Sequence, residues 1–80
     1  TAPFPLELAE RVVKMFSFVG DTVLDPFLGT GTTLLAAGLW GRNGIGYEID
    51  PKYIEYSHER LREDLHLSRA NIQVEKQSNE

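Results

Sequence analysis

The chain has 80 residues, a formal net charge of −4 at pH 7 and no cysteine. The negative charge argues against this segment gripping nucleic acid by itself, because such binding needs a basic surface, and the lack of cysteine excludes disulfides and thiolate metal sites. No apolar run approaches the ~20 residues of a membrane span and no leader typical of export is recognisable, so we expect a cytoplasmic protein with no membrane partner.

Apolar residues at helical spacing predict a first helix over residues 5–17, which begins at a proline suited to the first turn. A turn then leads into a strand over residues 22–26. The loop 27–30 follows, and a second helix is expected over about residues 31–40. Gly41 is placed to end this helix, because helices commonly close on a left-handed residue and glycine adopts that conformation readily.

A second strand is expected over about residues 45–49, shortly before a third helix over residues 51–67. Asp50 and the proline after it form a strong helix start, since the aspartate oxygen caps the helix and the proline ring fixes the first φ angle. Residues 68–80 lose the helical pattern. We expect either a flexible tail there or a short extra strand over residues 72–74, where apolar and polar residues alternate.

The order of these elements predicts the α/β class, with a parallel sheet and flanking helices that form part of a doubly wound domain. Such sheets are normally buried on both faces. Two or three strands also leave long open edges, which invite pairing with another chain. We therefore interpret residues 1–80 as one half-domain that needs another half, a partner chain or self-association.

The most informative segment is residues 25–33, with the sequence DPFLGTGTT, which lies between the first strand and the second helix. Gly29 and Gly31 let the backbone approach a ligand with no Cβ in the way. The helix start beyond them offers unpaired N–H groups and a partial positive charge. Asp25, at the end of the strand, can accept hydrogen bonds. Together these features predict a site for a nucleotide-like cofactor.

Two standard glycine loops match this segment poorly. A phosphate-binding P-loop needs a lysine where Thr32 stands. The dinucleotide fingerprint needs a third small residue where Leu34 stands, and we expect Leu34 to block close packing of helix on strand. Glu48 strengthens the nucleotide interpretation, because it follows Gly29 by 19 positions, near the ~20-residue spacing at which a strand-end carboxylate meets ribose hydroxyls. The alternative is that Asp25 and Glu48 only end strands and cap helices.

Three motifs in order closely resemble the C-terminal part of the DNA amino-methyltransferases. They are residues 2–8 (APFPLEL), residues 23–33 (VLDPFLGTGTT) and residues 46–53 (GYEIDPKY). The resemblance implies a Rossmann-like methyltransferase fold that binds S-adenosylmethionine, in an enzyme that methylates the N6 of adenine or the N4 of cytosine, as in restriction-modification. Within this family, the chain resembles the group in which the catalytic segment precedes the cofactor motif.

The resemblance also implies a role for each motif. Phe4 and Pro5 would line the methionine side of the cofactor, Asp25 and the glycine loop would hold its amino and carboxylate groups, Glu48 would accept both ribose hydroxyls, and Ile49 would pack on the adenine ring. The full implied set of cofactor-binding residues is Phe4, Pro5, Asp25, Phe27, Gly29, Thr30, Gly31, Thr32, Thr33, Glu48 and Ile49.

One departure from the family concerns catalysis. The family carries an Asp/Asn/Ser-Pro-Pro-aromatic segment that hydrogen-bonds the flipped base, whereas the four prolines here, at 3, 5, 26 and 51, are never adjacent. We therefore assign no catalytic residue and expect no methyl transfer by this chain alone. An N-terminal catalytic part, a partner chain or a homo-oligomer would complete an enzyme that acts on DNA. The alternative function is a non-catalytic cofactor-binding or assembly module.

Several other polar or aromatic residues receive structural interpretations. His58 shares an apolar helix face, so we expect a core histidine, and the two histidines suggest no metal site. Arg60 and Asp64 are four apart and are expected to pair weakly. Ser57 has no neighbouring base and is not a nucleophile candidate. Trp40 is interpreted as a core or partner-facing side chain.

Overall fold

A computed structural model of the protein describes residues 5–26 and 28–77. Within these ranges helices and strands alternate, each predicted element is present, and the extra strand after residue 68 is formed. The elements are α1 (Leu6–Phe16), β1 (Thr22–Asp25), α2 (Thr32–Leu39), β2 (Asn43–Glu48), α3 (Pro51–Asp64) and β3 (Ile72–Lys76).

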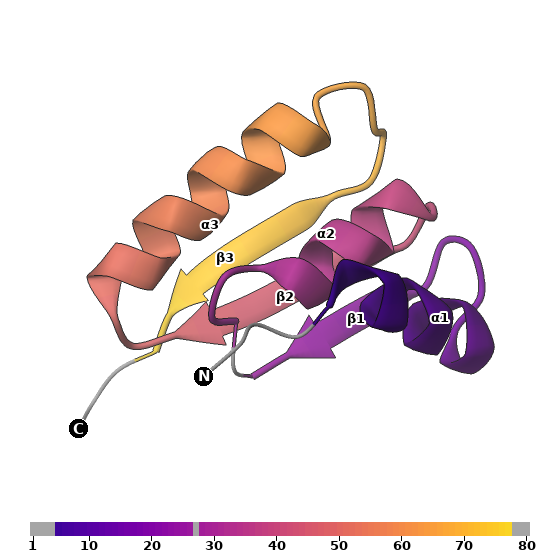
Figure 1. The fold of residues 1–80 in the computed structure, drawn as a ribbon, viewed down its shortest axis with the longest axis horizontal. Coiled ribbons are helices and arrows are strands. Elements are labelled where there is room, and N and C mark those ends of the chain that lie inside the picture. The colour runs from indigo at the N-terminus through magenta and orange to yellow at the C-terminus, as the bar shows by residue number, and fades with distance from the viewer. Residues whose placement is uncertain (1–4, 27, 78–80) are drawn as a thin grey trace.

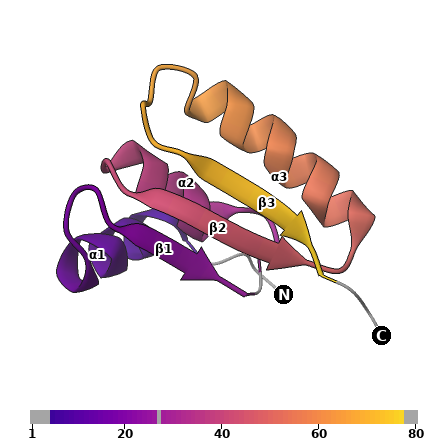
Figure 2. The same cartoon turned by 180° about the vertical axis from the view of Figure 1, so that it is seen from behind.

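The three strands form one parallel sheet in the order β1-β2-β3. All three helices lie on the same face of this sheet, and the view from behind shows the other face without a helix from the described part of the chain (Figures 1 and 2). The α/β class and the parallel sheet are confirmed. The flanking helices, however, cover one face only. Leu24 of β1 lies on the uncovered face and is 61% exposed.

Helix α2 is the centre of the core. It lies between α1 and α3 (Figure 1), and most of its residues are buried. Two apolar clusters meet on it. One lies between α2, the sheet and α3, and the other lies between α2 and α1. The first contains Leu28, Leu34, Leu35 and Leu61, and the second contains Ala9, Val13 and Ala36.

Leu34 packs tightly on the sheet, so the expectation that it would block close packing is wrong. The space comes from two glycines in β2. A Cβ added to Gly44 would lie 2.7 Å from Leu34 Cδ2, and one added to Gly46 would lie 2.7 Å from Leu34 Cδ1. In the dinucleotide fingerprint a small residue on the helix permits the close approach. Here the small residues are on the strand, and the large one is on the helix.

The segment after α2 docks onto the end of α1 through hydrogen bonds that the sequence did not predict. Arg42 is 6% exposed and donates to Ser17 Oγ at 3.0 Å, Ser17 O at 2.7 Å and Trp40 O at 2.7 Å. It thus satisfies carbonyls where both helices end. Trp40 is not a core residue, because it lies on the surface of α1, where its Nε1 donates to Glu10 and Lys14 Nζ lies 3.9 Å from its ring centroid.

None of the described helices combines the length and the apolar character that crossing a membrane requires.

Candidate functional site

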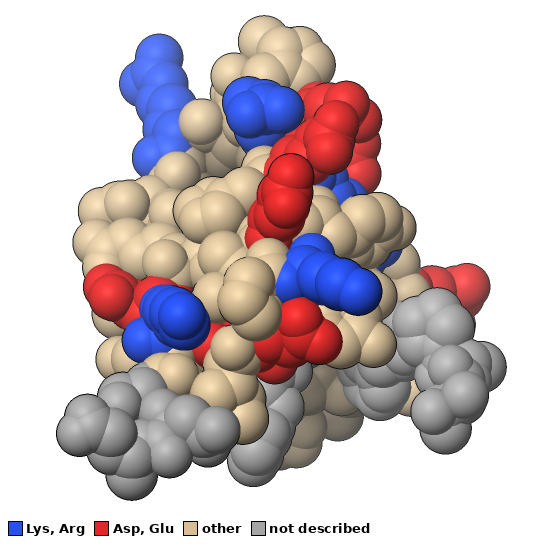
Figure 3. Space-filling view, turned by 90° about the vertical axis from the view of Figure 1, so that its left-hand side faces the viewer, with Lys and Arg blue, Asp and Glu red and all other residues tan. Residues whose placement is uncertain are grey.

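The carboxyl ends of the three strands meet at one end of the molecule (Figure 1). Asp25 ends β1 and Glu48 ends β2. The segment that joins β1 to α2, called the glycine loop here, contains Gly29, Thr30 and Gly31. Figure 3 views this end and shows acidic and basic side chains next to one another on it. In open α/β sheets ligands bind outside the carboxyl ends of the strands, which makes this end the candidate site.

The glycine loop adopts a conformation that favours glycine twice. Gly29 has φ +53° and Gly31 has φ +83°, both in the left-handed region that costs other residues about 1–2 kcal/mol. Gly31 is the N-cap of α2, and no side chain caps this helix. The first-turn N–H groups of α2 therefore receive no capping side chain and are placed to donate to an anionic group.

Glu48 fastens the loop after β1 to the turn after β2. Its Oε1 accepts from Gly29 N–H at 2.9 Å, and its Oε2 accepts from the N–H groups of Ile49 and Asp50, each at 3.1 Å. A carboxylate offers about four acceptor positions, so capacity remains for a ligand hydroxyl. The structural role expected as the alternative is thus real, and it is compatible with a binding role.

A hollow of about 650 Å³ lies beside Glu48. Ile49 is 49% and Tyr53 is 47% exposed, so an apolar surface flanks the carboxylate and could take a planar ring. The end of β3 also reaches this hollow, and Gln77 N–H donates to Glu48 O at 2.8 Å. The sequence pattern did not place this segment at the site. The residues around the hollow include Glu48, Ile49, Pro51, Tyr53, Lys76 and Gln77.

Other residues of the implied cofactor set lie apart from this hollow. Pro5 is exposed at the start of α1 and lines a small depression there. Thr33 lines a separate groove between α1 and β1. Thr32 is buried with its Oγ1 3.2 Å from that of Thr30. Asp25 is half-buried beside Gly46 in the register. The predictions for Phe4 and Phe27 lie outside the described residues.

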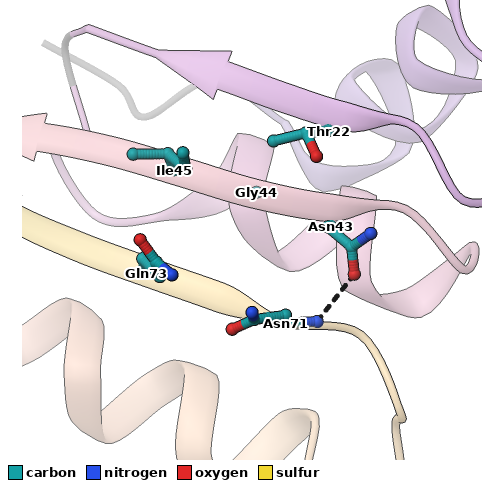
Figure 4. Close-up of a pocket in the computed structure, with 6 residues that line it drawn as sticks. All are labelled: Thr22, Asn43, Gly44, Ile45, Asn71 and Gln73. Atoms are coloured by element: carbon teal, nitrogen blue, oxygen red, sulfur yellow. Dashed lines mark hydrogen bonds between the residues drawn. The ribbon is translucent and has the colours of Figure 1, made fainter.

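A second, smaller hollow of about 140 Å³ lies at the opposite end of the strands (Figure 4). It is bounded by Thr22, Asn43 and Asn71, and Asn71 N–H donates to Asn43 Oδ1 at 2.8 Å. This hollow is at the amino end of the sheet and contains no glycine loop. It is the weaker candidate for a ligand site.

Two expectations about α3 are wrong. His58 is exposed, and Ser57 is the fully buried residue of that turn. The buried face of α3 carries Ser57 and Leu61, which are four residues apart. The apolar pattern did not indicate this face, because Ser57 is polar. Arg60 does not pair with Asp64 but donates to the glycine loop.

The comparisons with known proteins agree with this fold. A family model described as DNA methylase matches residues 1–59. The type II methyltransferase M.MthZI of Methanothermobacter thermautotrophicus is 54% identical over 67 residues, which are 84% of this chain and 19% of that protein. The type II methyltransferase M.MjaI of Methanocaldococcus jannaschii is 66% identical over 50 residues, which are 62% of this chain and 16% of that protein.

Solved structures give the same result. The putative DNA modification methylase TTHA0409 of Thermus thermophilus, solved in complex with S-adenosyl-L-methionine, superposes with a TM-score of 0.82 at 51% identity over 100% of this chain and 32% of its own. An RNA methyltransferase from Salinibacter ruber, at 22% identity and a TM-score of 0.76, supports the fold alone. This chain spans only a minor part of each curated relative named above, whereas the family model covers more than half of this chain. The chain therefore belongs to the DNA methylase family, as the three motifs implied.

Proposed function

We propose that this chain is the S-adenosylmethionine-binding portion of a DNA methyltransferase that modifies an exocyclic amino group of adenine or cytosine. The observation that carries the proposal is the hydrogen bond from Gly29 N–H to Glu48 Oε1. It joins the glycine loop and the strand-end carboxylate into one site beside the hollow at Ile49. The cofactor found in the complex of TTHA0409 supports the same assignment.

The residues at the site match the chemistry of this cofactor. Asp25 offers a carboxylate for the amino group, and the start of α2 offers N–H groups for the carboxylate. Glu48 keeps acceptor capacity for a ribose hydroxyl, while Ile49 and Tyr53 offer an apolar surface for the adenine. The bound cofactor itself supplies an activated methyl group on a positively charged sulfur. The chain's part is to hold that group in a fixed position, because alignment is a large share of such catalysis.

We also propose that the remainder of a methyltransferase domain covers the bare face of the sheet and supplies the catalytic segment and the DNA contacts. The exposure of Leu24 on that face supports this, as does the edge of β1 that no strand of the described residues pairs with, because parallel sheets are normally covered on both sides. The net charge of −4 leaves DNA contact to other segments. A cytoplasmic location and inactivity of this chain alone stay predictions.

The cofactor assignment is tested by isothermal titration calorimetry of the chain with three ligands. We expect S-adenosylmethionine and S-adenosylhomocysteine to bind, because both carry the adenosine and the amino-acid end that the site is built to hold. We expect no binding of NAD, because its pyrophosphate would bring two negative charges next to the carboxylates of Asp25 and Glu48. Equal heats for NAD and S-adenosylmethionine, or no heat for either nucleoside ligand, would refute the assignment.

A further inference from the structure

Two side chains of α3, Ser57 and Arg60, also hold the glycine loop, through its carbonyl groups. Ser57 is fully buried, and its hydroxyl lies 2.9 Å from Gly29 O and 2.7 Å from Tyr53 O. The single hydroxyl proton is shared between these two carbonyls, since each is a hydrogen-bond acceptor. A Cβ on Gly31 would lie 3.4 Å from Ser57 Cβ, so the loop and α3 are in direct contact.

Arg60, one turn further along α3, makes the second attachment. Its Nη1 donates to Thr30 O at 3.1 Å and to Thr32 Oγ1 at 3.0 Å, with Thr30 Oγ1 at 3.4 Å. Ser57 and Arg60 are three residues apart and therefore lie on the same side of the helix. Two consecutive loop carbonyls, those of Gly29 and Thr30, are thus held by neighbouring side chains of α3.

Holding these carbonyls fixes the direction of a loop amide. A trans peptide unit is planar, with its C=O and the following N–H pointing in opposite directions, and the described part of the chain contains no cis peptide bond. Because Gly29 C=O is directed at Ser57, the N–H of Thr30 is directed away from α3. Glycine permits many backbone conformations, so without these contacts the peptide between Gly29 and Thr30 could rotate and turn the amide inward.

We propose that Ser57 and Arg60 are positioning residues of the cofactor loop. By holding the carbonyls of Gly29 and Thr30 against α3, they direct the Thr30 amide toward the side on which the carboxylate of S-adenosylmethionine binds. This inference rests on the proposed function for its ligand. The ordering of the loop itself is a property of the free protein. Neither side chain touches the cofactor in this scheme.

The test compares Ser57→Ala and Arg60→Met with matched controls. Ser68→Ala is the control for Ser57→Ala. Ser68 Oγ also donates to a backbone carbonyl of another element, Gly38 O of α2 at 3.1 Å, but at the end of α2 that is far from the loop. Arg62→Met, on the exposed side of α3, is the control for the second. We expect calorimetry to show Kd for S-adenosylmethionine raised about 3- to 10-fold by Ser57→Ala and about 10- to 100-fold by Arg60→Met.

Rescue separates positioning from a general loss of stability. Arg60→Lys keeps a charged donor and should bring Kd back to within about threefold of the wild type, while both controls should leave Kd unchanged even if Ser68→Ala lowers the free energy of unfolding. Equal effects of Ser57→Ala and Ser68→Ala on Kd, or no difference between Arg60→Met and Arg60→Lys, would overturn the proposal.

A second readout keeps this proposal distinct from the cofactor assignment. In the free protein, amide hydrogen exchange of Gly29, whose N–H donates to Glu48, should be faster in Ser57→Ala and Arg60→Met than in Ser68→Ala and Arg62→Met. If the wild type bound no S-adenosylmethionine, the proposed function would fail and the ligand part of this inference with it. Exchange rates in Ser57→Ala that match those in Ser68→Ala would instead overturn the ordering of the loop by α3.

Discussion

Replacing Glu48 by glutamine is expected to raise Kd for S-adenosylmethionine about 30- to 1000-fold, which corresponds to about 2–4 kcal/mol. The carboxylate accepts N–H groups on both oxygens, from Gly29 on one and from Ile49 and Asp50 on the other. Glutamine turns one of these oxygens into a donor that faces other donors. The variant therefore loses acceptors for the ribose and also releases either the glycine loop or the following turn.

The matched control is Glu75→Gln, which changes an exposed carboxylate of β3 that does not line the hollow beside Glu48. Calorimetry on both variants, with urea unfolding curves alongside, measures the effect. We expect Kd of Glu75→Gln to stay within about twofold of the wild type, because its carboxylate makes none of the contacts of the site. The site as described would be contradicted if Glu48→Gln bound the cofactor as tightly as Glu75→Gln.

Gly46→Val is expected to lower the free energy of unfolding by about 1–3 kcal/mol, the usual cost of overpacking a core. A Cβ at this position would lie 2.7 Å from Leu28 Cδ1 and 2.7 Å from Leu34 Cδ1. Both leucines are buried, so neither side chain can turn into solvent to make room. The higher strand propensity of valine offsets only part of this cost. Because Leu34 belongs to the first turn of α2, the helix start would also move relative to the sheet.

Gln73→Val is the control for this substitution, because it adds a β-branched side chain at an exposed position of β3. Urea denaturation followed by circular dichroism gives the unfolding free energy of each variant. A domain of this size has little stability in reserve, so complete loss of the native signal in Gly46→Val also agrees with the prediction. A variant as stable as Gln73→Val would show that the contact between α2 and β2 is loose.

The elements of the fold were predictable because each carries a local signal. Asp50 caps α3 by accepting from Lys52 N–H at 2.9 Å, and Gly41 adopts φ +80° after α2, both as the sequence indicated. The meeting of Asp25 and Glu48 at one end also followed from sequence, because parallel strands joined by helices end at the same edge of the sheet. The sequence did not indicate that the helices cover only one face of the sheet. Apolar periodicity shows that a strand is buried, but it does not show on which side the helices will lie.

The polar contacts that hold the glycine loop and the end of α1 in place were not predictable. Ser57, Arg60 and Arg42 each bind carbonyls more than twenty positions away in sequence, and no periodic pattern marks such a partner. The error at His58 has the same origin. The small polar residue Ser57 takes the buried position next to His58, so the hydrophobic pattern of α3 wrongly indicated that His58 is buried. Leu34 was misjudged because the compensating glycines lie on another element.

One ligand that contacts both the glycine loop and the end of β2 should perturb both segments together, and a ¹H–¹⁵N NMR titration of the chain with S-adenosylmethionine measures this. We expect the largest chemical-shift changes on the amides of Gly29, Thr30 and Ile49, all following a single Kd. Changes confined to Asn43 and Asn71, at the opposite end of the sheet, or changes at the loop without any at Ile49, would contradict this expectation.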